Sequence, residues 1–545
     1  MLNNELFPRN TGIRRLFEKR LNLLIILTLI SATIFSYGSS IPNGFVWDDI
    51  DIIVNNVMNR ELSNIFILFQ SADSTLAGNQ TMYYRPLSRL TFMIDYKLFG
   101  LNPVWYHLEN ITIHIFAVLL LFLLMERLFN EPLLAFVTSC VFAVHPVNAE
   151  AVNFLSTRNT LLSAVFVLSS FIVYMRAGIT GKKVYSYLSA VLFFLGLLCK
   201  ETAFMLIVIL LFYDVTSLRD IRQRVKGKVS ELWPFAIAVT IYLGIRAYAV
   251  SNIVITNLAA ETLLPRVLNN VYIIPKYLMA ILFPVNLNAH YSVPDHYGTQ
   301  WIYILFAWTI IVVVMVFLLK MHRAAIRFGL FWFAINFVPI SNIIAIPSAP
   351  MADRYMYLPA IGLWLIAADL FCVLYARRTH RKAVVSCGVI ILICASTITF
   401  SRNFVWKDNI TFYTEMVKMN PDSELAHYSL GLASMERGDI TGAQREWKRT
   451  VEINPNYFNV LSLLGQSYLM QNSLAEAEYY YSKALAADPN KAEALYNLAV
   501  INEKLLRSRE ALYYYERFLE SPSNQYVNAI EKAREKVQRL RAGDK

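Results

Sequence analysis

The sequence predicts an all-α membrane protein, in which a polytopic helical domain precedes an α-solenoid of short helical repeats. Composition indicates the membrane: the 545 residues are 56% hydrophobic and 16% charged, with a mean hydropathy of +0.42. A soluble globular chain carries many more charged residues. Two further observations define the architecture. About a dozen apolar runs of near-spanning length precede Phe400, and a 34-residue repeat follows it.

Basic residues in the loops set the predicted orientation, since short cytoplasmic loops are enriched in Lys and Arg. Three apolar runs lie between the third and fourth basic clusters, although a return to the same side needs an even number of crossings. The run from Val271 to Val285, interrupted by Pro275 and Lys276, is therefore predicted to be re-entrant. Five basic clusters are assigned to the cytoplasm: 14–20, 176–183, 219–228, 320–327 and 377–382.

This assignment leaves about eleven crossings in a transmembrane domain that covers residues 1–404. The first outer loop, 41–108, and the tail, 405–545, are then predicted to lie together on the extracytoplasmic side. The net charge of +11 is concentrated in the short loops, so membrane topology accounts for it. We therefore expect membrane lipids as partners and no nucleic acid.

The tail contains an internal repeat with a period of 34 residues. Its small, aromatic and proline positions form the tetratricopeptide signature, in which small residues let paired helices approach closely. Three repeats are predicted between Leu425 and Asn524, with further helices on both sides. Such a solenoid is a binding surface, and Tyr428, Tyr468 and Tyr496 are predicted to line a groove for a protein or peptide acceptor. The columns in phase are Pro421, Pro455 and Pro489; Gly431, Gly465 and Ala499; Ala443, Ala477 and Ala511; and Trp447, Tyr481 and Tyr515.

Two adjacent carboxylates, Asp48 and Asp49, follow the first apolar run directly. A carboxylate beside a bilayer loses solvation and is kept there only where water, a partner or chemistry compensates. The alternative is a solvated loop that caps the next helix. The position of the pair at the end of a span favours a catalytic or ion-binding site.

Four cations are predicted on the same face as this acidic pair: Arg85, Arg158, Lys200 and Arg354. A carboxylate with several cations suits a phosphorylated lipid donor that is attacked by a hydroxyl group, because the carboxylate accepts the proton and the cations hold the leaving phosphate. A transporter could use the same groups, and each cation could instead reach lipid headgroups or pair with a neighbouring acid. The polar residues predicted to contact substrate are His145, Glu150, Glu201 and Tyr355.

Five segments, followed by tetratricopeptide repeats, resemble the transmembrane and tetratricopeptide-repeat O-mannosyltransferases. These proteins belong to the GT-C class of glycosyltransferases. The resemblance implies a GT-C fold, a polyprenyl-phosphate sugar donor, inversion at the anomeric carbon, and Asp48 or Asp49 as general base. The segments are FVWDDIDIIVNN, YYRPLSRLTFMIDYKLFGLNPVWYHLENITIH, FAVHPVNAEAVNFLSTRNTLLSAVF, CKETA and DRYMYLP.

The resemblance also sets expectations for substrate and location. The sugar is expected to be mannose or another hexose, and the acceptor a Ser or Thr hydroxyl of secreted or membrane proteins. No metal ligand is assigned, and the motif does not require a divalent metal, although an acidic pair can hold one. The small number of repeats, and Thr160 where the family has an acid, favour a bacterial relative. The active site and repeats are then expected on the periplasmic side of the inner membrane, or in the lumen of the endoplasmic reticulum for a eukaryotic chain.

Two other functions remain open from the residues. Some polymerases and ligases of surface polysaccharide also join membrane spans to tetratricopeptide repeats, and they use a lipid-pyrophosphate donor. A flippase for lipid-linked sugars, or a membrane-anchored assembly scaffold, would need no catalytic base. Transfer to protein, transfer to glycan, and movement without transfer distinguish the three.

Overall fold

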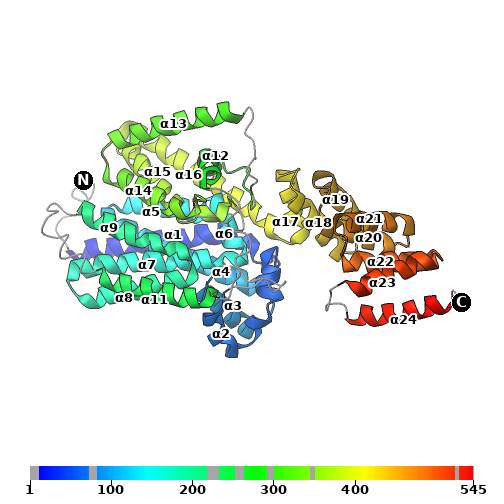
Figure 1. Ribbon diagram of the computed structural model, residues 1–545. Helices are drawn as coiled ribbons and strands as arrows, with labels where there is room; N and C mark the ends of the chain where they lie inside the picture. The colour runs from blue at the N-terminus through cyan, green and yellow to red at the C-terminus, as the bar shows by residue number, and fades with distance from the viewer. Residues whose placement is uncertain are drawn as a thin grey trace. The chain divides into compact units, whose positions relative to one another are not determined.

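A computed structural model describes most of the chain, and the described residues form helices, turns and loops with no strand among them (Figure 1). The predicted all-α class, a helical membrane region with a tetratricopeptide solenoid, is confirmed. The chain divides into two compact units, Met1–Asp408 and Asn409–Lys545. The described residues are 11–72, 83–217, 232–251, 263–289, 291, 300–343, 350–521 and 527–543.

The first unit is a bundle of helices that pack around a continuous apolar core. α4 contacts both α5 and α7, α8 packs against α7, and α11 packs against α8 (Figure 1). Gly329 on α14 and Gly362 on α15 face each other, and a Cβ at Gly329 would lie 2.5 Å from the Gly362 carbonyl oxygen. Such small residues let membrane helices approach closely. The helices are α1 (Thr11–Tyr37), α2 (Ile65–Gln70), α3 (Pro86–Phe99), α4 (Pro103–Phe129), α5 (Pro132–Val144), α6 (Ala149–Asn153), α7 (Arg158–Thr180), α8 (Lys183–Cys199), α9 (Met205–Ser217), α11 (Trp233–Val250), α12 (Leu263–Leu282), α13 (Gln300–Lys320), α14 (Ala324–Phe337), α15 (Ala360–Tyr375) and α16 (Arg381–Arg402).

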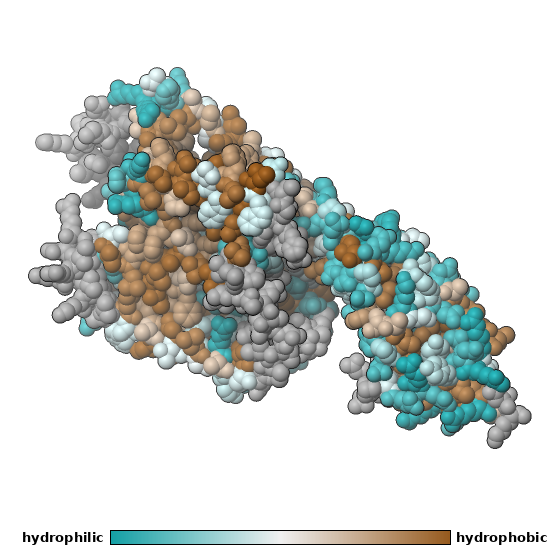
Figure 2. Space-filling model, turned by 45° about the horizontal axis from the view of Figure 1, so that its top comes forward, coloured by the Kyte–Doolittle hydropathy of each residue, from teal (hydrophilic) through white to brown (hydrophobic). Residues whose placement is uncertain are grey.

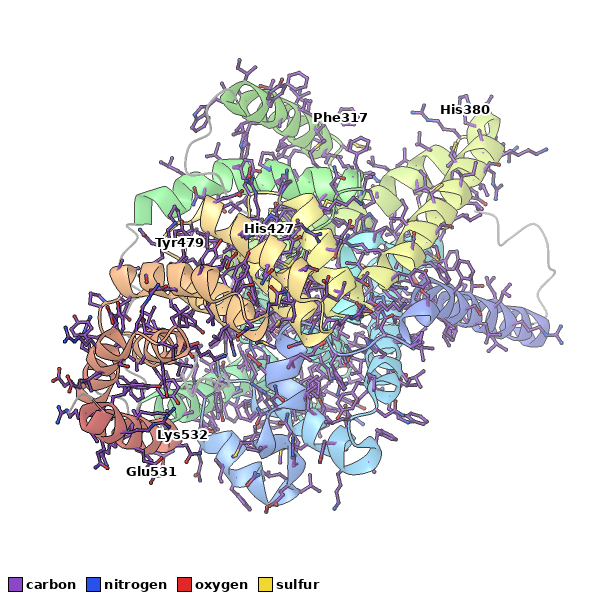
Figure 3. All side chains as sticks on the ribbon, turned by 90° about the vertical axis from the view of Figure 1, so that its right-hand side faces the viewer. Phe317, His380, His427, Tyr479, Glu531 and Lys532 are labelled. Carbon is purple, nitrogen blue, oxygen red and sulfur yellow. The ribbon has the colours of Figure 1, made fainter. Side chains whose placement is uncertain are left out.

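Six helical segments among the described residues are long and apolar enough to cross a membrane, or seven if the bent pair formed by α5 and Pro146–Asn153 is one span. Figure 2 shows hydrophobic side chains spread over the visible face of the first unit. Phe317 on α13, labelled in Figure 3, is 61% exposed. Such a surface needs lipid to cover it, and the chain is a multi-pass membrane protein.

The predicted count of eleven crossings stays a prediction, because three further apolar helices are shorter than the length that identifies a membrane span. α12 continues through Pro275, and the re-entrant assignment of this segment also stays a prediction. Part of the predicted first outer loop, residues 73–82, lies outside the described residues.

The second unit consists of paired helices in the predicted register. A Cβ at Gly431 would overlap the Trp447 ring, and one at Gly465 would lie 2.7 Å from the Tyr481 ring. The small residues therefore set the distance between the helices of a pair, as the signature predicts. The helices are α17 (Asn409–Met419), α18 (Glu424–Glu436), α19 (Ile440–Ile453), α20 (Phe458–Met470), α21 (Leu474–Ala487), α22 (Ala492–Lys504), α23 (Ser508–Glu520) and α24 (Val527–Gly543).

Candidate functional site

The two acidic residues have different surroundings. Asp49 is fully buried, and its Oδ1 accepts hydrogen bonds from the Ser156 backbone N–H at 2.7 Å and the Ser156 hydroxyl at 2.5 Å. Its Oδ2 accepts a third hydrogen bond, from the Val46 N–H at 3.2 Å. Burial raises the pKa of Asp49 to about 7, against the opposing effect of these hydrogen bonds. Asp49 thus joins the first loop to the turn η6 (Leu155–Thr157).

Asp48 is exposed. Enough protein surrounds it for burial to raise the pKa of its carboxyl group, while the positive charge of Arg354 lowers that pKa. The preceding residue, Trp47, has a φ of 53°, in the left-handed region that bulky residues seldom adopt. Such backbone strain is concentrated at functional sites. Of the two acids, Asp48 is the one that solvent can reach.

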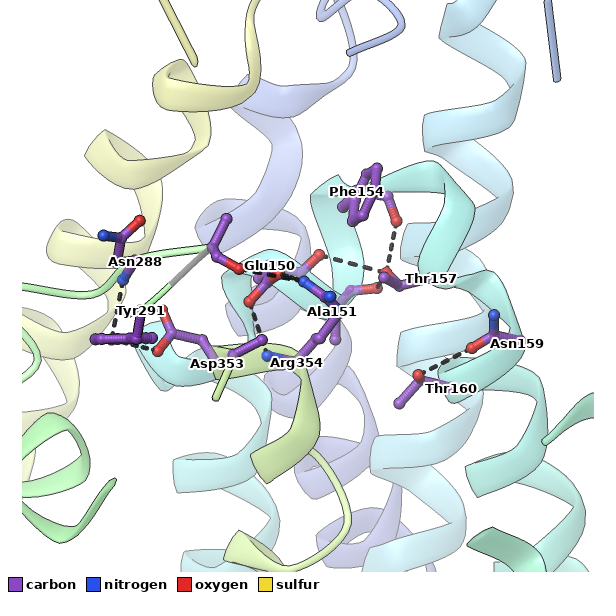
Figure 4. A network of polar contacts seen from close by, with 12 residues as sticks. Glu150, Ala151, Phe154, Thr157, Asn159, Thr160, Asn288, Tyr291, Asp353 and Arg354 are labelled. Atoms are coloured by element: carbon purple, nitrogen blue, oxygen red, sulfur yellow. Dashed lines mark hydrogen bonds and ion pairs between the residues drawn. The ribbon is translucent and has the colours of Figure 1, made fainter. Parts of the chain in front are cut away.

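Arg354 is held in place by Glu150 of α6. One Glu150 carboxylate oxygen accepts a hydrogen bond from the Arg354 backbone N–H at 2.9 Å, and the other pairs with the Arg354 guanidinium (Figure 4). The same guanidinium donates to the Ala289 carbonyl at 3.3 Å. Burial alone would lower the pKa of Arg354. The negative charge of Glu150 raises it, the net shift is upward, and this guanidinium therefore stays charged.

Aromatic rings surround the Arg354 guanidinium. Its carbon lies 5.0 Å from the centroid of the Tyr355 ring, 5.7 Å from Trp47 and 5.9 Å from Phe154. Cations are attracted to such ring faces.

Asp353 accepts a hydrogen bond from the Tyr291 hydroxyl at 2.7 Å (Figure 4). Its other carboxylate oxygen pairs with Arg402 at 3.2 Å. Burial raises the pKa of Asp353, and Arg402 opposes this rise. Sequence reasoning missed both partners. Tyr291 precedes Asp353 by 62 positions, and no spacing rule connects such residues.

Arg85 and Lys200 bring two more positive charges to this region. Arg85 forms a bidentate ion pair with Glu201: its Nη2 lies 2.7 Å from Oε1 and its Nε lies 3.2 Å from Oε2. Burial would raise the pKa of Glu201, but Arg85 outweighs it and lowers this pKa to about 2. The Lys200 amino group donates to the Thr160 hydroxyl at 2.8 Å and lies 5.8 Å from the Tyr355 ring centroid.

Lys200 has an unusual pKa for a lysine. Burial lowers it to about 7, and the positive charges of Arg85 and Arg354 lower it as well, against Glu201 and Glu150. Arg85 and Arg354 therefore both lie close enough to Lys200 for their charges to act on it. The structure therefore brings together five of the predicted residues around Arg354 and Lys200: Arg85, Glu150, Glu201, Tyr355 and, through its charge, Asp48.

Arg158 and His145 are engaged by other groups of the protein. Arg158 is 0% exposed and binds Asp95 at 2.5 Å and Glu109 at 2.9 Å, so two carboxylates already neutralise it. Both ring nitrogens of His145 engage backbone: Nδ1 accepts from the Val147 N–H at 3.2 Å, and Nε2 lies 3.0 Å from the Ile281 carbonyl. Their predicted roles toward substrate stay predictions.

The three tyrosines of the predicted acceptor groove lie on the first helix of each repeat and are half-buried: Tyr428 on α18, Tyr468 on α20 and Tyr496 on α22. Each also packs on a neighbouring ring. Tyr428 lies 5.3 Å from Tyr457, and Tyr468 stacks on Tyr480 at 5.6 Å. They contribute to the solenoid core, and part of each side chain stays exposed.

No group of three or more His, Cys, Asp or Glu side chains that could hold a metal ion occurs in the described parts of the chain. The acidic residues of the site instead face cations, as Glu150 faces Arg354 and Glu201 faces Arg85.

Comparison with known proteins gives two findings. The tetratricopeptide repeat family matches residues 428–492 and 463–525. The chain is also 28% identical over 459 residues to a protein O-mannosyl-transferase of Caenorhabditis elegans, covering 82% of this chain and 64% of the relative. It is 25% identical over 556 residues to protein O-mannosyl-transferase TMTC3 of Homo sapiens, covering 90% and 60%.

A third relative, protein O-mannosyl-transferase TMTC1 of Homo sapiens, is 26% identical over 498 residues, covering 80% of this chain and 56% of the relative. The predicted resemblance is therefore confirmed. The chain spans about three fifths of the length of these relatives.

Proposed function

We propose that this relative of the protein O-mannosyl-transferases is an inverting glycosyltransferase that moves one sugar, mannose or another hexose, from a polyprenyl-phosphate donor to a Ser or Thr hydroxyl of a protein. The observation that carries the proposal is the reachable Asp48 carboxylate beside Arg354, with Arg85 and Lys200 in the same electrostatic cluster. The names of the relatives support the sugar and the acceptor.

Asp48 is the general base in this proposal. Its carboxylate takes the proton of the acceptor hydroxyl, the hydroxyl oxygen forms a bond to the anomeric carbon, and the bond from that carbon to the phosphate oxygen breaks. A single displacement inverts the configuration. Asp49 positions the loop, because its two oxygens are occupied by Ser156 and Val46.

The leaving phosphate gains negative charge as that bond breaks. Arg354 is held rigidly by Glu150, and a fixed cation stabilises developing charge without reorganising. Lys200 and Arg85 add positive charge beside it. The proposed mechanism needs no metal. We also propose that the active face and the repeats lie on the extracytoplasmic side of the membrane.

The repeats are proposed to hold the protein acceptor. The exposed parts of Tyr428, Tyr468 and Tyr496 offer apolar and hydrogen-bonding surface to an extended peptide. A covalently attached binding module raises the local acceptor concentration toward the ~mM range for a short linker.

The test supplies radiolabelled polyprenyl-phosphate mannose to membranes that contain the full chain. We expect label on Ser or Thr of protein, and none with Asp48→Asn. Label on glycan alone would favour a polysaccharide polymerase, and movement of the lipid without transfer would favour a flippase.

The acceptor groove has its own test. A protease site inserted between Asp408 and Asn409, at the boundary of the compact units, releases the repeats after the chain has folded. We expect donor binding to persist, protein transfer to fall, and a short peptide acceptor at high concentration to restore turnover. Loss of donor binding together with turnover would mean that the repeats only stabilise the membrane unit.

A further inference from the structure

The short turn η11 (Asn403–Trp406), which directly precedes the repeats, packs against the loop that carries Asp48. The Asn43 side chain donates to the Asn403 carbonyl at 2.8 Å, and the Gly44 N–H donates to the Lys407 carbonyl at 2.9 Å. A Cβ at Gly44 would lie 3.3 Å from that carbonyl oxygen. The backbones thus approach closely four residues before Asp48.

A stack of three aromatic rings forms a second connection. Trp406, which is 1% exposed, stacks on Phe154 with centroids 5.3 Å apart, and Phe154 stacks on Trp47 at 5.3 Å. Trp47 adjoins Asp48 and has the left-handed backbone described above. Because a strained conformation persists only where its surroundings enforce it, this stack is well placed to hold Trp47.

η11 is itself firmly anchored. The Asn403 side chain donates to the Ser36 carbonyl and the Ser39 hydroxyl, both at 2.8 Å. Its Oδ1 accepts from the Asn153 side chain at 2.8 Å. Such fully bonded polar side chains rigidify the elements they join, here the end of α1 and the helix α6 that presents Glu150.

From these contacts we infer that Trp406 and Asn403 are positioning residues for the Asp48 carboxylate: Trp406 acts through Phe154 and Trp47, and Asn403 acts through Asn43. The inference rests on the proposed function only in that Asp48 is the base. The segment that leads into the repeats is thereby part of the scaffold of the catalytic loop.

The first test compares two aromatic residues of the same turn. Trp406→Ala is expected to lower kcat for transfer by about 10- to 100-fold, with donor KM within about twofold, since a shift of about 1 Å in a catalytic group costs that much. Trp406→Phe keeps a stacking ring and should restore most of kcat. Phe404→Ala is the matched control: Phe404 is exposed and packs on Phe400, outside the stack.

Unchanged kcat in folded Trp406→Ala protein would overturn the inference, as would parallel loss of donor affinity and turnover. If Trp406→Ala does not fold, Asn43→Asp decides the matter. It has the same size but sets an acceptor against the Asn403 carbonyl, and it should lower kcat without raising donor KM. Normal turnover in this variant would also contradict the inference.

A second readout does not depend on the reaction. Carbodiimide modification of Asp48, followed by peptide mass spectrometry on the full-length protein, reports the surroundings of that carboxyl group. We expect Trp406→Ala to change the rate by about threefold or more, and Phe404→Ala to leave it unchanged. An unchanged rate in Trp406→Ala overturns the positioning role. If the rate depends on Trp406 but no sugar is transferred, the proposed function fails and the positioning role stands.

Discussion

Arg158 and Arg354 are both buried arginines of the first unit, and their surroundings differ in how much negative charge they already hold. Two carboxylates, Asp95 and Glu109, bind Arg158. One carboxylate, Glu150, binds Arg354, and aromatic rings and a backbone carbonyl complete its surroundings. The charge of Arg354 also acts on Lys200, and the amino group of Lys200 donates a hydrogen bond to a hydroxyl, not to a carboxylate. The Arg354 region thus has one paired carboxylate for each arginine and Lys200 in addition, whereas the Arg158 region has two carboxylates for one arginine. A phosphate is therefore repelled less in the Arg354 region.

The same contrast separates the two acids. Asp49 accepts hydrogen bonds on both carboxylate oxygens and connects two loops. Asp48 is exposed, and the positive charge of Arg354 lowers the pKa of its carboxyl group. Groups that are saturated with partners stabilise the fold, and groups with remaining capacity can act on a ligand. Sequence position alone gives these neighbours the same role.

The largest effect is expected at the acidic pair. Asp48→Asn removes the proton acceptor and should lower kcat by about 10²–10⁴-fold while the melting temperature stays unchanged. Asp49→Asn sets an amide N–H against the donors from Ser156 or Val46, and should lower the melting temperature. Turnover and thermal unfolding in detergent measure both. A loss under about tenfold for Asp48→Asn would contradict its role as base.

A matched pair of arginine substitutions follows. Arg354→Lys keeps the charge beside Glu150 but loses the planar fork, so donor KM should rise about tenfold with little change in stability. Arg158→Lys should leave donor KM unchanged and reduce the free energy of unfolding by ~1–3 kcal/mol, because buried hydrogen bonds to carboxylates are lost. The reverse pattern would place the donor phosphate at Arg158.

The pH dependence of donor binding sharpens the role of Lys200, whose pKa is lowered to about 7. Below that pH the amino group is charged and attracts phosphate, and above it the charge is lost. Donor KM should therefore rise as pH increases through about 7. Arginine stays charged, so Lys200→Arg should abolish this rise. The raised pKa of Arg354 keeps its guanidinium charged through this window, and the low pKa of Glu201 keeps its carboxylate ionised. A flat KM profile in the unmodified protein would exclude Lys200 from donor binding.

The smallest effect is expected in the repeats, which form the second unit. The turn between paired helices needs a left-handed residue, supplied by Gly438, Asn472 and Leu506, with φ of 81°, 58° and 59°. Leu506 is 89% exposed and loses nothing by truncation. Leu506→Gly should raise the free energy of unfolding of the repeats by ~1 kcal/mol, measured by denaturant unfolding. Unchanged or lower stability would mean that the Leu506 side chain has a partner.

The repeat unit could be predicted from the sequence in detail, because its determinants are local. A 34-residue period fixes which residues face each other within a pair, so Gly431 was expected to approach the second helix and does so at Trp447. The all-α class followed from composition and apolar runs in the same way. The motifs near the site were also visible, since Asp48, Arg354 and Lys200 stand in recognisable segments.

By itself, therefore, the sequence determined the helical membrane class, the repeat register, and the residue types gathered in the candidate site. Only the tertiary structure decided which charges neutralise one another: Glu150 with Arg354 across 204 positions, and Asp353 with Arg402 across 49. The physical reason is that the free energy of a buried charge depends on the partners that packing brings to it, and those partners come from distant segments. Local pattern names the candidates, and long-range packing determines which of them can still act on a ligand.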